Sequence, residues 1–142
     1  MALLDSLNLD FKGKIIVVLG QGELVGKPTA ALLRYRGLTY LTITSKTENK
    51  EYLLQRADVV ISGMGKGKYI TGNIIKSGAV LIDAGTSEEK NSSLDNRKNI
   101  VGDVDLESVK NVAGFVSPVP GGVGPVTVAM LFNNVLKVAK SL

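Results

Sequence analysis

The 142-residue chain contains no cysteine, no histidine and no tryptophan. Without cysteine it can form neither disulfides nor thiolate metal sites. Without histidine it lacks the commonest general base at neutral pH and the commonest protein metal ligand. Acid–base chemistry would therefore depend on Lys, Asp, Glu or Tyr, and we expect no metal site.

Long apolar runs and clustered charges are also missing. No run approaches the roughly 18 residues that a membrane-spanning helix needs, and residues 1–5 do not begin a secretory leader. The 17 Lys and Arg against 13 Asp and Glu give a net charge of +4, and these charges are scattered along the chain. We therefore expect a cytoplasmic protein with neither a membrane nor a nucleic-acid partner, and with a mild attraction for phosphorylated small molecules.

The composition, 44% apolar and 21% charged, is that of a single globular domain over residues 1–142. Continuous apolar runs such as 15–19 are typical of strands buried on both faces of a parallel sheet. Their alternation with helical patterns predicts an α/β, Rossmann-type, doubly wound sheet that is mostly parallel, with helices on both faces. We expect strands at 15–19, 40–44, 58–62, 79–83, 99–101 and 114–116, helices at 28–36, 48–56, 73–76, 106–110 and 126–140, a short opening helix around Leu3, Leu4 and Leu7, and a polar, mobile connection over 88–98.

Gly20, Gly22 and Gly26 lie between the first expected strand and a helix. In this context glycines allow a tight turn and let backbone N–H groups approach a pyrophosphate, while the helix dipole adds a favourable field. The loop therefore predicts a dinucleotide site. The spacing is one residue longer than the common pattern, and a tight turn without a ligand is the alternative.

The second expected strand runs into Ser45 and Lys46, with no acid at its end. NAD-binding proteins of this architecture usually have Asp or Glu there to bind the ribose hydroxyls. A hydroxyl and an ammonium suit the 2′-phosphate of NADP better. The sequence favours NADP, but Glu48 is close and NAD remains an alternative.

The segment 118–127 reads Pro-Val-Pro-Gly-Gly-Val-Gly-Pro-Val-Thr, and six of its ten residues are Pro or Gly. A helical pattern follows, and Pro125 lies where we expect that helix to begin, where a missing N–H costs little. The segment predicts a stiff lip, poor in side chains, that suits a ring or an anion. An ordinary turn is the alternative.

Several motifs occur in an order that resembles one family: Val25-Gly26-Lys27-Pro28, Ser45-Lys46-Thr47, Gly102-Asp103-Val104-Asp105 and the segment 118–127. The chain closely resembles the C-terminal cofactor domain of the bifunctional methylenetetrahydrofolate dehydrogenase/methenyltetrahydrofolate cyclohydrolase family. The resemblance implies an NAD(P)-binding domain that places nicotinamide for hydride transfer from 5,10-methylenetetrahydrofolate.

The same resemblance implies a role for each loop. It places Gly121 and Gly122 between nicotinamide and folate, and Thr86 beside the nicotinamide carboxamide. The other residues that it implies in cofactor binding are Gly20, Gln21, Gly22, Val25, Gly26, Ser45, Lys46, Gly63, Met64, Gly65, Gly85 and Thr127.

The chain departs from the family at two of these loops. Gln21 and Gly22 stand where the family usually has Arg-Ser, and each lost charge-assisted hydrogen bond to phosphate would cost about 1.5–3 kcal/mol. Thr86 and Ser87 replace the usual Ile-Asn, which leaves a backbone contact at Thr86 as the expected one.

The family's catalytic lysine belongs to a Tyr-x-x-x-Lys pair of an N-terminal folate domain, and this chain contains no such pair. We therefore expect residues 1–10 to be the remnant of an inter-domain helix, and the chain to bind cofactor without a catalytic residue. A stand-alone nucleotide-binding module without catalysis, or a purely structural partner, are the alternatives. Apolar residues of the opening and closing helices should form an exposed patch that favours a homodimer, unless Leu3, Leu4 and Leu7 pack onto the sheet.

Overall fold

The fold centres on a five-stranded parallel sheet in a computed structural model that describes residues 1–90 and 98–141. The strands are β1 (Ile16–Leu19), β2 (Tyr40–Ile43), β3 (Val59–Ser62), β4 (Val80–Asp83) and β7 (Phe115–Ser117). Their order is β2-β1-β3-β4-β7, and every neighbouring pair is parallel. The chain leaves β1 toward β2 and later returns to the other side of β1 as β3. Ligands bind at such switch points in open α/β sheets.

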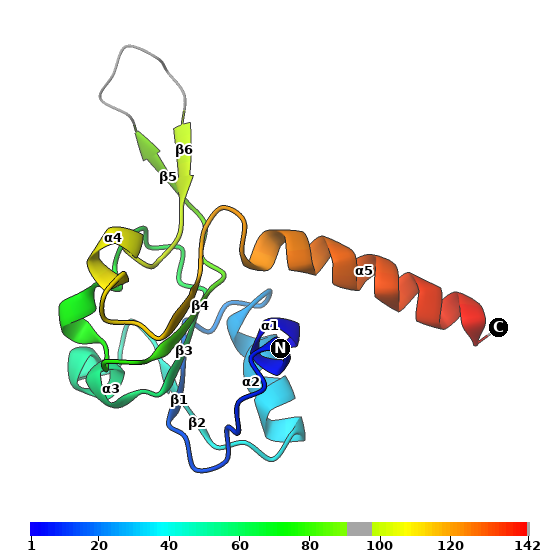
Figure 1. Ribbon diagram of the computed structural model, residues 1–142, viewed down its shortest axis with the longest axis horizontal. Coiled ribbons are helices and arrows are strands. Elements are labelled where there is room, and N and C mark those ends of the chain that lie inside the picture. Colours follow the sequence, from blue (N-terminus) through cyan, green and yellow to red (C-terminus); the bar gives the residue numbers. More distant parts are fainter. Residues whose placement is uncertain (91–97, 142) are drawn as a thin grey trace.

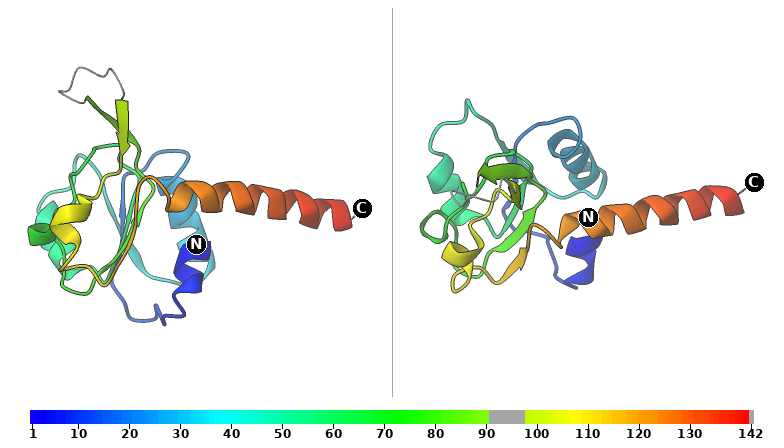
Figure 2. Two further views of the ribbon diagram at one scale, coloured as in Figure 1. Left: turned by 45° about the horizontal axis from the view of Figure 1, so that its top comes forward. Right: turned by 90° about the horizontal axis from the view of Figure 1, so that it is seen from above.

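Helices cover both faces of this sheet (Figures 1 and 2). On one side lie α1 (Ala2–Ser6) and α2 (Gly26–Tyr35), and on the other lie α3 (Lys50–Arg56), the 3₁₀ turn η1 (Gly72–Ile74) and α4 (Leu106–Val109). The predicted Rossmann-type fold is therefore confirmed. Gly37, with φ of +69°, ends α2 in the left-handed conformation that glycine tolerates.

The core consists of two apolar layers, one on each face of the sheet. Along β1, Ile16 and Val18 pack into the layer of α1 and α2, whereas Val17 and Leu19 pack into the layer of α3 and α4. Both sets of side chains are excluded from solvent. This double burial explains why the strand sequences are continuous apolar runs.

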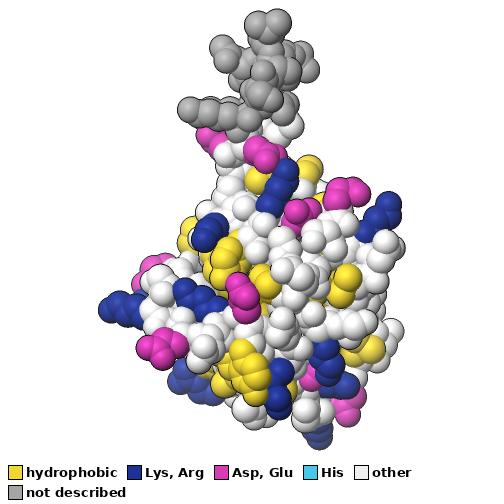
Figure 3. All heavy atoms as spheres, turned by 90° about the vertical axis from the view of Figure 1, so that its left-hand side faces the viewer, with side chains coloured by type: hydrophobic (Ala, Val, Ile, Leu, Met, Phe, Trp, Pro, Cys, Tyr) yellow, Lys and Arg dark blue, Asp and Glu magenta, His cyan; other side chains and the backbone are white. Residues whose placement is uncertain are grey.

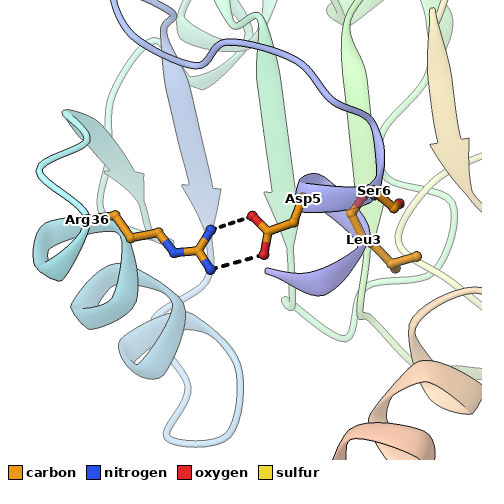
Figure 4. A network of polar contacts seen from close by, with 4 residues as sticks. All are labelled: Leu3, Asp5, Ser6 and Arg36. Carbon is orange, nitrogen blue, oxygen red and sulfur yellow. Dashed lines mark hydrogen bonds and ion pairs between the residues drawn. The ribbon is translucent and has the colours of Figure 1, made fainter.

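The opening helix packs onto the sheet. Leu4 is 2% exposed and belongs to the core layer of α2. Asp5 accepts two hydrogen bonds from the Arg36 guanidinium, at 2.5 and 3.0 Å (Figure 4). This pairing lowers the pKa of Asp5. The prediction that the opening helix adds to an exposed patch is therefore wrong for Leu4, because the short helix folds back against α2.

The closing helix exposes apolar residues, as the sequence predicts. Helix α5 (Val123–Lys140) has no buried residue and projects away from the sheet (Figures 1 and 2). Its exposed apolar residues recur at helical spacing and form what we call the α5 stripe: Val128, Leu131, Phe132, Val135, Leu136 and Val138.

Several element predictions need correction. The helix expected at 73–76 is the 3₁₀ turn η1, and α3 begins at Lys50 rather than at residue 48. Ser87–Lys90 and Lys98–Val101 are antiparallel strands β5 and β6 of a separate two-stranded sheet, so the connection expected over 88–98 is wrong at its two ends. Its remaining residues, 91–97, lie outside the described part. Helix α2 begins at Gly26, two residues before Pro28, and α5 begins at Val123. Proline is tolerated throughout the first helical turn, where no intrahelical N–H bond is lost, so it does not mark the first residue.

The described helices include none long and apolar enough to cross a membrane. On the face that carries α3 and α4, acidic and basic side chains are interspersed (Figure 3). Nucleic-acid sites usually concentrate positive charge, and the described residues of this face show no such concentration.

Asp58 connects two loops at the amino end of the sheet. Its Oδ2 accepts the Ile15 N–H at 2.8 Å and its Oδ1 accepts the Lys76 ammonium at 2.6 Å. These contacts, the lysine first, lower the pKa of Asp58. When folding lowers the pKa of a carboxyl, that carboxyl adds to the free energy of unfolding at pH values above its pKa in the unfolded chain. This contribution disappears as the pH falls through its pKa in the folded protein.

We therefore expect Asp58→Asn to reduce the free energy of unfolding at pH 7 by about 1–2 kcal/mol. The difference from the wild-type chain should shrink below about pH 4. Urea unfolding at several pH values measures it, with Glu48→Gln, at an exposed acid, as the control. An equal difference at pH 3 and pH 7 would show that the charge of Asp58 is not the source.

Candidate functional site

A cleft of about 390 Å³ opens at the carboxyl ends of β1, β2 and β3, which is the switch point of the sheet. The loops that follow these strands form its walls. They bring together six of the predicted cofactor residues: Gly20, Gln21, Gly22, Ser45, Gly63 and Met64. Ile43, Thr44, Lys50, Lys66 and Tyr69 complete the lining.

The loops after β1 and β3 approach so closely that they require glycine. Gly20 has a φ of +86°, and a Cβ there would lie 2.8 Å from the Gly63 carbonyl oxygen. A Cβ at Gly63 would lie 2.5 Å from Cγ1 of Val25. Val25 therefore supports the floor of the cleft from behind, because it fills the space beneath Gly63.

Gly26 begins α2 directly against the first loop. A Cβ on Gly26 would lie 2.7 Å from both the Gly20 carbonyl carbon and the Gln21 Cα, and closer still to the Gly20 carbonyl oxygen. The Lys27 N–H donates to the Gly22 carbonyl at 3.1 Å, and Pro28 has no N–H. The start of α2 thus contributes the field of its dipole more than free hydrogen-bond donors.

The charged residues that line the cleft are Lys50 and Lys66. The Lys50 ammonium donates to the Ser45 carbonyl at 2.9 Å, and the Lys66 ammonium lies 4.6 Å from the centre of the Tyr69 ring. Both charged side chains that the described residues bring to this lining are positive, and positive charge in a cleft attracts phosphate groups. Lys46, which the sequence indicates for this task, is exposed and does not line the cleft.

Sequence reasoning missed Lys50, Lys66 and Tyr69. One signal for Lys50 was available: it begins α3, where a positive side chain opposes the helix dipole. An unfavourable lysine in that position indicates that its ammonium has a binding partner outside the helix. The structure shows such a partner, the Ser45 carbonyl. Lys66 and Tyr69 carry no comparable signal, because they lie in a loop whose path is set by the tertiary fold.

A second pair of loops, after β3 and β4, lies beside the cleft. Gly65 has a φ of +66°, and a Cβ there would lie 3.8 Å from the Thr86 carbonyl oxygen, so the two loops are neighbours. Gly85 is buried and Thr86 is exposed. The structure thus places Gly65, Gly85 and Thr86 together, next to the residues that line the cleft.

The last strand residue before this second loop is Asp83, which is 1% exposed. Its Oδ1 accepts the N–H groups of Gly85 at 2.9 Å and Asp103 at 3.1 Å, and its Oδ2 accepts the N–H of Val104 at 2.8 Å. Burial raises the pKa of Asp83, and the three backbone donors oppose that effect. Asp83 thereby fixes the start of the loop that leads to Thr86.

The Pro- and Gly-rich segment leads from β7 into α5. The Val119–Pro120 bond is cis, and Gly121 has a φ of +102°. Gly122 is the N-cap of α5, and a Cβ there would collide with the Pro118 carbonyl oxygen. These features give the short, side-chain-poor turn that the sequence predicts.

Thr127 lies apart from the cleft. Its hydroxyl donates to the Val123 carbonyl at 2.9 Å, within α5. It lines a separate pocket of about 410 Å³ between α5 and the body of the domain, together with Val25 and Ala84. The structure therefore does not bring Thr127 together with the residues of the cleft.

Among residues 1–90 and 98–141, no three acidic side chains are grouped so that they could hold a metal ion.

Comparison with known proteins gives consistent matches along the whole chain. Residues 1–142 match the family described as the tetrahydrofolate dehydrogenase/cyclohydrolase, NAD(P)-binding domain. The bifunctional protein FolD of Natranaerobius thermophilus is 43% identical over 140 residues, which are 99% of this chain and 47% of that protein. The mitochondrial C-1-tetrahydrofolate synthase of Saccharomyces cerevisiae is 43% identical over 140 residues, which cover 14% of its length.

Solved structures agree. The methylenetetrahydrofolate dehydrogenase-cyclohydrolase of Trypanosoma brucei, in complex with NADP and an inhibitor, superposes with a TM-score of 0.90 at 37% identity. That match covers 99% of this chain and 48% of the other. The chain thus spans about half the length of the FolD proteins that it matches.

The close contact at Gly26 leads to a test with a matched control. Gly26→Ala should cost about 1–3 kcal/mol of unfolding free energy, because the methyl group forces α2 away from the Gly20 loop. Gly22→Ala, whose Cβ would have nothing within 4 Å, should change it by less than about 0.5 kcal/mol. Urea unfolding measures both. Equal effects would show that the close approach at Gly26 does not hold the loop.

Proposed function

Because this chain belongs to the tetrahydrofolate dehydrogenase/cyclohydrolase NAD(P)-binding domain family, we propose that it binds NADP for an oxidoreductase of one-carbon metabolism. In that reaction, hydride passes from 5,10-methylenetetrahydrofolate to nicotinamide, and the longer enzyme also hydrolyses the methenyl product. The observation that carries the proposal is the cleft at the switch point, which combines glycine walls with two lysines.

The residues of the cleft fit a dinucleotide. Gly20, Gln21 and Gly22 present backbone to the phosphates, at a turn where a side chain on Gly20 would strike the next loop. Gly63, Met64 and Gly65 form the wall for the adenosine half. When bound, NADP supplies the hydride acceptor, and the chain's share is orientation and electrostatics.

The nicotinamide half is assigned to the second pair of loops. Gly85 and Thr86 would contact the carboxamide through their backbone atoms. Such a contact does not depend on the side chain, so Thr86 can replace the family's usual Ile. Gly121 and Gly122 would form the lip against the folate, since they bring no side chain into the gap. Thr127 supports this lip from within α5, through its bond to Val123, without touching the cofactor.

The preference for NADP over NAD rests on charge. The Lys50 ammonium donates to the Ser45 carbonyl at 2.9 Å beside the end of β2, and no acid among residues 1–90 and 98–141 lines the cleft. Lys50 can therefore bind the 2′-phosphate, the role that the sequence suggests for Lys46. Gln21 acts against this preference, because its amide donates to the Gly20 carbonyl at 2.9 Å and brings no charge.

The relatives are about twice as long as this chain, and their additional length suggests a partner for it. We propose that the folate-binding half of a longer protein packs on the α5 stripe, and that the stripe pairs with a second copy of this chain where that half is absent. The catalytic lysine would come from the folate-binding half. The cytoplasmic location expected from the sequence stays a prediction.

A stand-alone nucleotide-binding module without catalysis is not favoured. The family match extends along residues 1–142, and the relatives are bifunctional enzymes. A purely structural role would not require a lysine-lined cleft at the switch point.

The first test is calorimetric titration of the chain with NADP and, separately, with NAD. We expect NADP to bind about tenfold more tightly or better, because the 2′-phosphate gains charge-assisted bonds near Lys50. Lys50→Gln should remove most of this difference and leave NAD affinity unchanged. Lys110→Gln, at the exposed end of α4, is the control.

Each alternative has its own result in this titration. Tighter binding of NAD would overturn the assignment of Ser45 and Lys50 while keeping the family. Absence of binding to both would overturn the proposed function. With methylenetetrahydrofolate added, the chain alone should not reduce NADP, and turnover would contradict the assignment of the catalytic lysine to the other half.

The α5 stripe predicts self-association. Phe132→Lys with Val135→Lys, at side chains 70% and 61% exposed, should weaken dimerisation at least tenfold, because each protomer would bring two charges into the interface, where they would be desolvated. Sedimentation velocity over a concentration series measures this, with Lys140→Gln as the control. A wild-type chain that stays monomeric throughout would refute the homodimer.

A further inference from the structure

Asp103 is a fully buried carboxylate that none of the roles above uses. It is 0% exposed and follows Gly102 just beyond β6. Its Oδ2 accepts the Ser62 hydroxyl at 2.6 Å and the Met64 N–H at 2.7 Å, and its Oδ1 accepts the Lys66 N–H at 2.7 Å. A buried charge is costly unless donors surround it, and here three donors do so.

All three donors lie within residues 62–66, the strand end and the loop that lead into one wall of the cleft. Ser62 ends β3, and Met64 and Lys66 line the cleft itself. Gly65 lies between the two bonded N–H groups and takes the left-handed conformation, with φ of +66°. The carboxylate therefore holds this loop from its inner side, while the outer side of the loop faces the cleft.

Asp103 also touches the neighbouring loop. A Cβ on Gly85 would collide with the Asp103 carboxylate. The Asp103 N–H is bound by Asp83, which also binds the Gly85 N–H. The walls assigned to the adenosine and nicotinamide halves are thus braced by the same buried group.

We propose that Asp103 is a positioning residue for the cofactor cleft, and this inference rests on the proposed function. It fixes the backbone of residues 63–66 before the dinucleotide arrives, without touching it. Binding to a loop that is already ordered avoids the free-energy cost of ordering it on association. Asp103 therefore acts on affinity for the whole dinucleotide, whereas Lys50 acts on the choice between NADP and NAD.

The test is Asp103→Asn, which keeps the shape but replaces one acceptor by a donor that must face Ser62, Met64 or Lys66. NADP and NAD affinities should both fall about tenfold or more, with their ratio unchanged. Amide hydrogen exchange in the ligand-free chain should accelerate selectively at Met64 and Lys66. Both readouts are taken well below the unfolding temperature of each variant.

Two further variants separate positioning from loss of stability. Val109→Ala creates a cavity in the core at a fully buried residue of α4, so it should lower stability without changing affinity or the exchange of these two amides. Ser62→Ala removes one donor and leaves the two loop bonds, so it should weaken binding less than Asp103→Asn. If Asp103→Asn does not fold, Ser62→Ala still tests the proposal.

The outcomes are distinguishable. Unchanged affinity and unchanged exchange at Met64 and Lys66 in Asp103→Asn, with a wild-type chain that binds NADP, overturn the inference and leave the proposed function standing. Equal losses of affinity in Val109→Ala and Asp103→Asn also overturn it, because loss of stability would then explain both. A wild-type chain that binds neither dinucleotide overturns the proposed function and, with it, this role of Asp103.

Discussion

Two buried carboxylates, Asp83 and Asp103, impose the main constraint on this fold. Each is almost completely excluded from water, so each must collect hydrogen-bond donors from the protein. The donors available at the carboxyl end of the sheet are backbone N–H groups of the loops, and the loops are therefore drawn around the carboxylates. Gly85 and Gly102 are required because any side chain there would occupy the carboxylate positions. The shape of the cleft follows from this need for donors.

Much of the scaffold was predictable because local sequence determines it. The runs at β1, β3 and β4 are apolar on both faces, and only strands covered by helices on both sides accommodate them. Glycines next to a strand end marked the first loop of the cleft. The family resemblance followed from short motifs whose backbone requirements are strict, and the comparisons confirmed it.

The remaining features depend on contacts that no local pattern encodes. Strand β5 has no apolar residue, and Glu88 and Glu89 are exposed, so only its pairing with β6 defines it. Lys50 enters the cleft because α3 begins at the mouth of the cleft, whereas Lys46, four residues earlier, faces solvent. Asp103 contacts Met64 across a sequence separation of 39 residues. Helix starts were misplaced by two or three residues, since proline fits several positions of a first turn.

Helix α5 has a consequence for how the molecule unfolds. Beyond its first turns it gains almost nothing from burial, so its order rests on internal hydrogen bonds, whereas most helical stability in proteins comes from tertiary packing. Its amides should exchange with solvent through local fraying, while those of β1 and β3 require global unfolding. The sheet and α5 should therefore unfold separately. The sheet unfolds as one cooperative unit, whereas the order of α5 depends on the partner that packs on it. A partner that binds the helix would stabilise the helix more than the sheet.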